Sequence, residues 1–165
     1  MDLNSYIKEV PDFPKKGIIY KDIQPLLADP KAFKHAIVSM KNITNSLKRG
    51  KVDYWVGIES RGFIFASALA RETDKGFKMI RKPGKLPNQS NLVSLQYDLE
   101  YGSDTIEMQK GKGRVIIVDD VYATGGTMEA AKELCIEAGY TVLDTVCLLD
   151  IGIVEGHDTK VLIND

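Results

Sequence analysis

The chain has 165 residues, of which 44% are hydrophobic and 27% are charged, and its formal net charge is −1. This length and composition predict a single globular domain over residues 1–165. The near-neutral charge argues against nucleic acid or an anionic membrane as a partner, and no segment reads as a signal peptide or a membrane span. Cys135 and Cys147 lack the spacing of a metal site. We therefore expect a cytoplasmic protein.

The N-terminal part combines a loop-rich segment with one clear helix. Residues 5–10 are expected to form a short helix, which the prolines after them would end. Residues 13–27 mix turn formers with apolar residues and predict an ordered loop with short extended pieces. Asp29 and Pro30 then form a capping signal, and apolar residues recur at steps of three and four over residues 33–47. This pattern predicts an amphipathic helix.

A strand–loop–helix unit follows. Residues 54–58 are an apolar run that predicts a buried strand, and a helical pattern begins near Phe63. Between them lies the sequence Glu59-Ser60-Arg61-Gly62. A cation and a glycine at a helix N-terminus are typical of an anion site, although Arg61 alone would suit a structural ion pair. Residues 77–80 predict a further strand, and the alternation of strands and helices predicts a parallel sheet.

A basic segment and a predicted hairpin come next. Arg81, Lys82 and Lys85 lie close together in residues 81–87, called here the basic arm, which also contain two prolines and a glycine. Such a segment is either a solvated basic loop or a mobile arm that brings positive charge to phosphates. Residues 95–101 and 105–108 predict the two strands of the hairpin.

The most informative motif spans residues 115–127. Its first four residues predict a strand buried on both faces, and Asp119 and Asp120 follow at the carboxyl end. A loop of small residues comes after them: Ala123, Thr124, Gly125, Gly126 and Thr127. Because a helical pattern follows, this loop offers free backbone N–H donors and two hydroxyls to a phosphate. Two acids beside such a cradle suit a ligand with hydroxyls or a divalent cation, as in a ribose 5-phosphate.

Five stretches together resemble the type I phosphoribosyltransferases: residues 13–27, 57–70, 81–87, 97–108 and 115–127. The runs Gly-Ile-Glu-Ser-Arg-Gly-Phe and Tyr-Asp-Leu-Glu-Tyr-Gly point to the adenine branch of that family. The resemblance implies an α/β fold with a central parallel sheet flanked by helices. It also implies a small N-terminal hood over about residues 1–30, a core over about residues 31–165 and a flexible hairpin arm.

The activity implied by the resemblance is a step of purine salvage. The phosphoribosyl group of phosphoribosyl pyrophosphate (PRPP) is transferred to adenine, giving AMP and pyrophosphate. Because pyrophosphate leaves with a large negative charge, the main catalytic task is electrostatic. The resemblance further implies a homodimer and Mg²⁺ as cofactor, held mainly through substrate oxygens, with Asp119 and Asp120 as candidate protein ligands.

The resemblance assigns roles to the candidate residues. The loop over residues 123–127 would bind the 5′-phosphate, and Asp119 and Asp120 the ribose hydroxyls. A second group would face the pyrophosphate, with Arg61 and Lys82 as catalytic residues; its members are Glu59, Ser60, Arg61, Arg81, Lys82 and Lys85. A cis peptide bond is implied before Ser60.

The adenine side of the site would come from two other segments. Tyr20 would stack on the purine, and the backbone of Ile19 and Lys21 would read its polar edge. Glu100 would hold or exchange a ring proton as a general acid or base, although composition alone would make it an exposed hairpin acid. Tyr122 stands where the family often carries an aliphatic residue, so we expect the ribose side to be shaped differently.

Two alternatives stay open. The enzyme could act on another purine base, such as hypoxanthine or guanine, whose 6-oxo group reverses the donor and acceptor at the base edge. The chain could instead be a non-catalytic regulator that senses PRPP. The presence of Glu100, Arg61 and the basic arm argues against the regulator.

Overall fold

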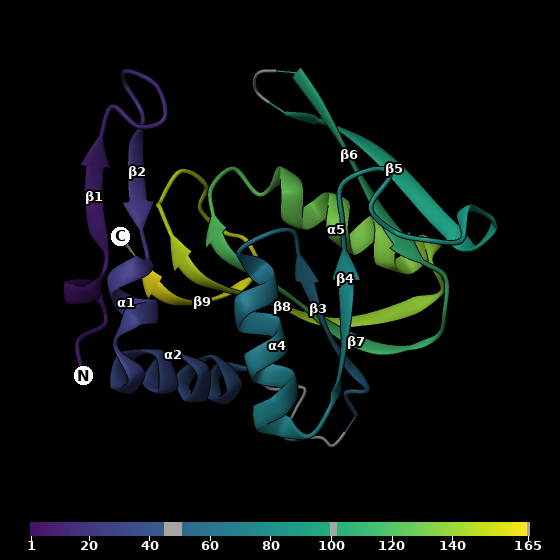
Figure 1. Ribbon diagram of the computed structural model, residues 1–165, viewed down its shortest axis with the longest axis horizontal. Helices are drawn as coiled ribbons and strands as arrows, with labels where there is room; N and C mark the ends of the chain where they lie inside the picture. Colours follow the sequence, from purple (N-terminus) through teal and green to yellow (C-terminus); the bar gives the residue numbers. More distant parts are fainter. Residues whose placement is uncertain (45–50, 100–101, 165) are drawn as a thin grey trace.

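The computed structural model describes residues 1–44, 51–99 and 102–164 (Figure 1). Its centre is a five-stranded sheet in the order β4-β3-β7-β8-β9, in which every neighbouring pair is parallel. The strands are β3 (Tyr54–Ile58), β4 (Gly76–Ile80), β7 (Gly113–Tyr122), β8 (Tyr140–Asp150) and β9 (Lys160–Asn164). The prediction of a central parallel sheet is therefore confirmed, and β7 occupies its middle.

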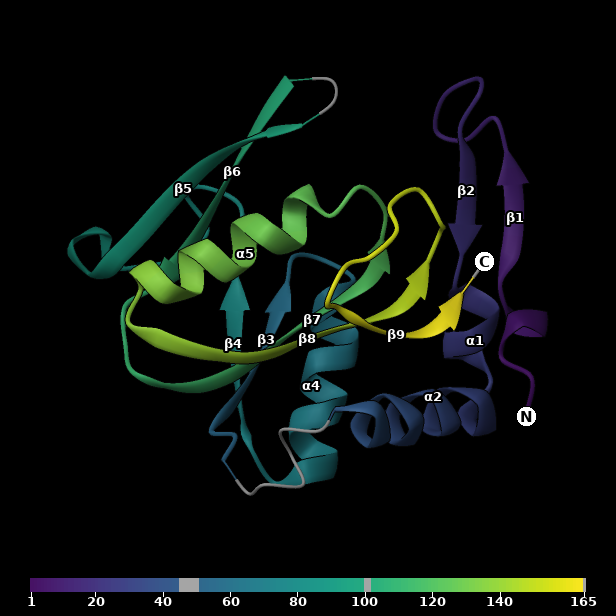
Figure 2. The same ribbon diagram turned by 180° about the vertical axis from the view of Figure 1, so that it is seen from behind.

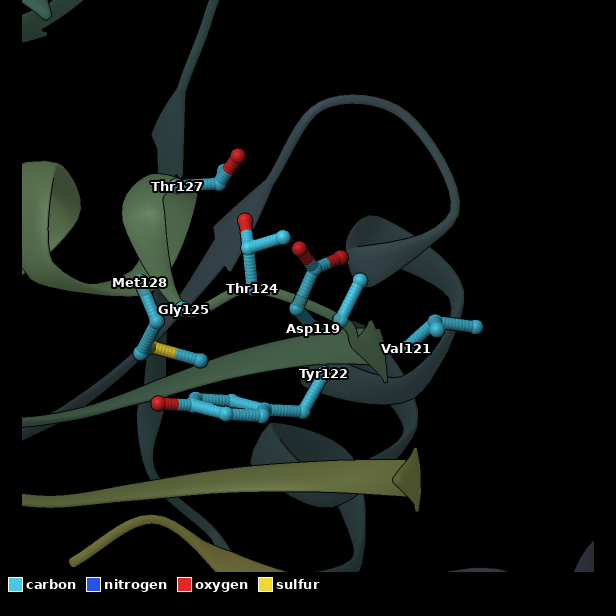
Figure 3. A pocket seen from close by; sticks show the side chains of 8 residues that line it. Asp119, Val121, Tyr122, Thr124, Gly125, Thr127 and Met128 are labelled. Atoms are coloured by element: carbon cyan, nitrogen blue, oxygen red, sulfur yellow. The ribbon is translucent and has the colours of Figure 1, made fainter. Parts of the chain in front are cut away.

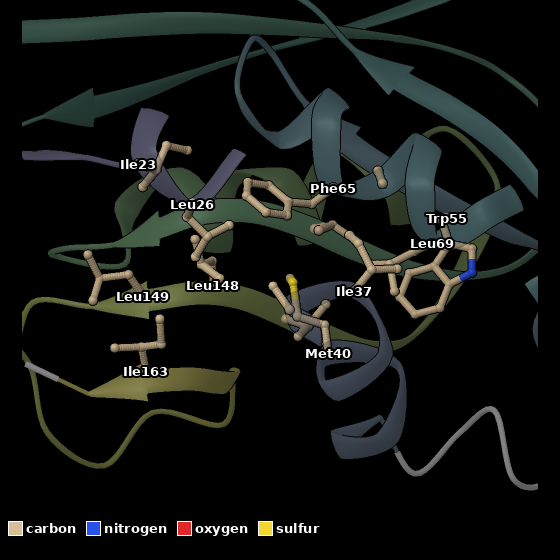
Figure 4. Close-up of a cluster of buried hydrophobic side chains, with 14 of the residues drawn as sticks. Ile23, Leu26, Ile37, Met40, Trp55, Phe65, Leu69, Leu148, Leu149 and Ile163 are labelled. Atoms are coloured by element: carbon tan, nitrogen blue, oxygen red, sulfur yellow. The ribbon is translucent and has the colours of Figure 1, made fainter. Parts of the chain in front are cut away.

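Helices cover both faces of this sheet, with α5 on one side and α2 and α4 on the other (Figure 2). Their bounds are α2 (Pro30–Ile43), α4 (Gly62–Thr73) and α5 (Gly126–Glu137). Figure 4 shows the core between α2, α4 and the sheet, where Met40, Phe65 and Leu148 pack together. All three side chains are fully buried, so this contact fixes α4 against the sheet.

Strand β7 is buried on both faces, as its sequence predicts. Ile116 and Val118 belong to the core cluster on the α2 and α4 side, whereas Val115 and Ile117 pack on the α5 side. The alternation follows the two-residue period of a strand. The strand is longer than the apolar run, because it continues through both aspartates to Tyr122. Its pairing with β8 supplies the backbone hydrogen bonds of this extension.

Helix α2 begins where the sequence indicates. The Asp29 side chain accepts hydrogen bonds from the N–H groups of Lys31 at 2.9 Å and Ala32 at 2.8 Å, and Pro30 is the first helical residue. These bonds satisfy donors that have no partner within the helix. Residues 45–50, where the helix was expected to continue, lie outside the described part of the chain.

The N-terminal hood contains a strand where we expected a helix. Before β2, the only helical residues are the single turn η1 (Asn4–Tyr6), and β1 (Lys8–Pro11) pairs antiparallel with β2 (Ile19–Asp22). The helix prediction over residues 5–10 was wrong because so short a helix is unstable alone, whereas pairing with β2 satisfies the backbone. A short helix, α1 (Gln24–Ala28), follows β2 and buries Leu26 in the core.

The predicted hairpin is present and longer than expected. After the short turn η2 (Gln89–Asn91), β5 (Leu92–Leu99) pairs antiparallel with β6 (Gly102–Gln109). Leu95, Ile106 and Met108 pack in the cluster that contains α5, so the base of the hairpin rests on that helix.

In the described part of the chain, no helix has both the length and the apolar character that crossing a membrane requires.

Candidate functional site

The carboxyl ends of β3 and β7 lie side by side, and a pocket of about 310 Å³ opens there. Ligands of open α/β sheets bind at this edge. The lining includes Ser60, Arg61, Lys82, Asp119, Asp120 and Thr127. Residues from three separate predicted motifs therefore meet at one pocket.

The loop over residues 123–127, called here the phosphate loop, forms a second pocket of about 80 Å³ (Figure 3). The side chains of Thr124, Thr127 and Asp119 point to the same side of it. Gly125 is the N-cap of α5 and has a φ of 85°, a conformation that favours glycine. The free N–H groups of the first helical turn and the two hydroxyls form a cradle for an anion.

The two aspartates at the end of β7 have different surroundings. The Asp119 carboxylate accepts a hydrogen bond from the N–H of Asp120 at 2.9 Å. Asp120 is 5% exposed, and its Oδ2 lies 2.7 Å from Nε of Arg61. Burial raises the pKa of Asp119 well above its usual value, and the negative charge of Asp120 raises it further. Asp120 thus has a cationic partner, whereas Asp119 lies beside a second carboxyl.

Glu59 forms ion pairs with two cationic side chains of the basic arm. Its carboxylate lies 2.8 Å from Nε of Arg81 and 3.0 Å from Nζ of Lys85. The N–H of Lys82 donates to the same carboxylate at 3.4 Å. Although burial raises the pKa of Glu59, the hydrogen bonds from Lys85 and Arg81 hold it below its usual value. A third pocket, of about 440 Å³, lies between these side chains and Ser60.

Two site residues were missed from the sequence, and both lie on the hairpin. Asp104 forms an ion pair with Lys82. The hydroxyl of Tyr97 lies 3.5 Å from the Asp104 carboxylate and 3.4 Å from Oγ1 of Thr127. Tyr97 and Asp104 are directly opposite in the β5–β6 register, so a predicted register could have placed them together. They link the hairpin to the arm and to the phosphate loop.

The hood contributes Tyr20 to this region. Nη1 of Arg61 donates a hydrogen bond to the Tyr20 hydroxyl at 2.6 Å, and the guanidinium lies 5.2 Å from the ring centroid. Ile19 is 58% exposed, whereas the Lys21 side chain forms an ion pair with Glu9. The prediction assigned only the backbone of Lys21 to adenine recognition. The ion pair of its side chain with Glu9 therefore does not test that prediction.

Three further predictions concern the peptide bond before Ser60, Glu100 and the metal. The peptide bond between Glu59 and Ser60 is cis, as the resemblance implies. Glu100 lies outside the described residues, so its role stays a prediction. Within the described ranges, no cluster of three His, Cys, Asp or Glu side chains could hold a metal ion. Mg²⁺ commonly binds through one or two carboxylates and substrate phosphates, and Asp119 and Asp120 fit that pattern.

The phosphoribosyl transferase domain family matches residues 23–163, which include the phosphate loop and all of the sheet except the last residue of β9. The fold and the site thus define a phosphoribosyltransferase. An adenine phosphoribosyltransferase from Hydrogenovibrio crunogenus is 55% identical over 150 residues, which cover 90% of this chain and 85% of that protein. The chain belongs to the adenine phosphoribosyltransferase family.

Solved structures of that family agree closely with the fold. The Thermoanaerobacter pseudethanolicus adenine phosphoribosyltransferase is 38% identical and has a TM-score of 0.88, over 99% of this chain and 98% of its own. The Saccharomyces cerevisiae enzyme, solved with adenine and an imino-altritol bisphosphate, is 35% identical. Its TM-score is 0.86, over 96% of this chain and 94% of its own.

The contact between the two aspartates predicts a measurable change in titration. Asp120→Asn removes the charge beside Asp119 but leaves Asp119 in the same half-buried position. We expect the pKa of Asp119 to fall and to stay above its usual value, because burial persists. A carbon-detected NMR titration of the Asp119 carboxyl measures this pKa.

Asp144→Asn is the matched control, because Asp144 is a partly buried carboxyl on β8 that lies outside both pockets of the β7 edge. This control should leave the titration of Asp119 unchanged. If Asp120→Asn also leaves it unchanged, the two carboxyls do not interact as described.

Proposed function

We propose that this chain transfers the phosphoribosyl group of PRPP to adenine, forming AMP and releasing pyrophosphate. The observation that carries this proposal is the arrangement along the edge of the sheet. An anion cradle follows β7, two carboxylates lie beside it, and a cluster of cations follows β3. PRPP carries a phosphate, two free hydroxyls and a pyrophosphate in the corresponding order.

The phosphate loop binds the 5′-phosphate of the substrate. Its backbone N–H groups and the hydroxyls of Thr124 and Thr127 donate to the phosphate oxygens. Asp119 and Asp120 accept hydrogen bonds from the ribose hydroxyls, which are donors of matching chemistry. The ribose is thereby held with its anomeric carbon toward the end of β3.

The cations stabilise the leaving group. The bond between the anomeric carbon and the pyrophosphate oxygen breaks, and its electron pair leaves with the pyrophosphate. Arg61 and Lys82 act as catalytic residues that stabilise this charge, while Glu59 holds Arg81 and Lys85 at the same pocket. When bound, Mg²⁺ supplies further neutralisation of the pyrophosphate charge, with Asp119 as a candidate protein ligand beside the substrate oxygens.

Adenine enters beneath the hood. The contact between Tyr20 and Arg61 supports a purine position between the hood and the cation cluster, where Tyr20 stacks on the ring. The backbone of Ile19 and Lys21 recognises its polar edge. As one ring nitrogen bonds to the anomeric carbon, Glu100 accepts the proton from another ring nitrogen. The yeast relative, which was solved with adenine, supports this choice of base.

A product assay tests the choice of base directly. The chain is incubated with PRPP, Mg²⁺ and one of adenine, hypoxanthine or guanine, and the nucleotides are separated by chromatography. We expect AMP and pyrophosphate in equal amounts, with little IMP or GMP. Dominant formation of IMP or GMP would favour another purine base, and the absence of all three would favour the PRPP-sensing regulator.

Glu100→Gln tests the proton transfer. The amide keeps the size of the side chain but cannot accept a proton, and general acid–base groups contribute about 10²–10⁴-fold in rate. We therefore expect kcat to fall by roughly that factor, while the affinity for PRPP stays at the wild-type value. Steady-state kinetics at saturating adenine and direct PRPP binding measure the two quantities.

Glu133→Gln makes the same substitution at an exposed position on α5 and should change neither kcat nor PRPP affinity. If kcat of Glu100→Gln matches that of this control, Glu100 is a surface acid. Adenine would then be recognised by Tyr20 and the neighbouring backbone without it.

We also propose that the chain is a cytoplasmic homodimer. Ile64 on α4 and Met79 on the edge strand β4 are large apolar side chains that are 37% and 39% exposed. They belong to α4 and β4, the two elements that precede the basic arm in the chain. Burying them in a subunit contact would be favourable. Light scattering should give twice the chain mass of 18.3 kDa. A single species of 18.3 kDa at micromolar concentration would exclude the dimer.

A further inference from the structure

Tyr122 ends β7 just before the phosphate loop, and its side chain lies beneath that loop (Figure 3). Tyr122 is 4% exposed and lines the same 80 Å³ pocket as Thr124 and Gly125. A Cβ atom added to Gly125 would lie 2.4 Å from the Tyr122 hydroxyl oxygen, so this oxygen packs against the glycine. Met128 lies over the same ring in Figure 3. The tyrosine thus forms the floor of the phosphate loop.

A histidine from a distant part of the chain supports this floor. The ring centroids of Tyr122 and His157 are 4.0 Å apart, and the ring planes are tilted by 34°. His157 belongs to the connection between β8 and β9, and its side chain is 15% exposed. The ring contact therefore joins this connection to the phosphate loop.

Asp150 fixes the orientation of the imidazole. It ends β8 directly opposite Tyr122 in the strand register, and its Oδ2 lies 2.9 Å from Nε2 of His157. Its Oδ1 accepts the N–H of Gly152 at 2.9 Å. Burial raises the pKa of Asp150, but these two hydrogen bonds hold it below the usual value. The carboxylate is therefore ionised at neutral pH, and Nε2–H of the imidazole donates to it.

The phenol of Tyr122 suits a position beneath a phosphate. Burial raises its pKa, and the negative charge of Glu129 raises it further. The group therefore stays neutral at the pH where the phosphate is a dianion, so it adds no repulsion. Replacing the tyrosine by a smaller side chain would leave Gly125 without this contact.

We propose that Tyr122, His157 and Asp150 are positioning residues that hold the phosphate loop in its binding conformation before the ligand arrives. This inference rests on the proposed function, because it takes the 5′-phosphate as the ligand of the loop. Without the ring contact, the loop must be ordered when the ligand binds, and that cost weakens the affinity for the 5′-phosphate. Pyrophosphate is held by the residues around Glu59 and the arm, so its affinity does not depend on the ring contact.

His157→Gln separates the ring from the hydrogen bond, because the glutamine amide can still donate to Asp150. We expect the dissociation constant for ribose 5-phosphate to rise about three- to tenfold, the range that loss of one aromatic pair allows. The dissociation constant for pyrophosphate should not change. Isothermal titration calorimetry with each compound measures both values, and thermal unfolding confirms that the variant is folded.

His35→Gln is the matched control, because His35 is an exposed histidine on α2. It should bind both compounds like the wild-type chain. Equal ribose 5-phosphate affinity in the two variants, or equal losses for both compounds in His157→Gln, would overturn the positioning role. If His157→Gln does not fold, Tyr122→Leu removes the same ring contact from the other side, and the same selective loss is expected.

The experiments distinguish a failure of the positioning role from a failure of the proposed function. A wild-type chain that forms AMP, with variants that bind ribose 5-phosphate equally, retains the function and loses the positioning role. A wild-type chain that neither forms AMP nor binds ribose 5-phosphate would overturn both.

Discussion

The burial of β7 at the centre of the sheet is the constraint on which the rest of the site depends. Apolar side chains cover both of its faces from Val115 to Val118, and the two aspartates follow where the strand reaches the edge of the core. A shift of the strand by one residue would draw Asp119 into an apolar position, where an unpaired carboxylate is very unfavourable. The core therefore sets the depth at which the aspartates and the phosphate loop lie.

The cations of the site are paired with carboxylates before any ligand binds. Arg61 contacts Asp120, Lys82 contacts Asp104, and Glu59 contacts both Arg81 and Lys85. The partners in each pair come from different loops or strands, so the ion pairs also connect the separate segments of the site. A pyrophosphate would have to compete with these carboxylates for the same cations. Its net affinity is then the difference between two sets of favourable contacts, which suits a product that must leave.

The sequence predicted the features that depend on neighbouring residues. It did not predict the features that depend on contacts between segments far apart in the chain. The phosphate loop and the capped start of α2 at Asp29 were predictable, because glycines, caps and apolar periodicity act within a few residues. The strand at residues 8–11 was not, since β2 stabilises it from across a turn. Asp104 was missed because its role comes from Lys82, which lies in another segment. His157 lies in an irregular connection, where no periodic pattern marks a contact with Tyr122.

The pairing of β3 with β7 also has a consequence for how the chain folds. These neighbours in the sheet are separated in sequence by α4, β4, the arm and the whole hairpin. Closing so long a loop is a slow, late step, because its entropy must be lost before the strands gain contacts. The two halves of the binding site therefore do not exist in any partly folded chain that lacks this pairing. A ligand that spans both halves binds only the native state, so it stabilises the fold by an amount that grows with its free concentration relative to Kd.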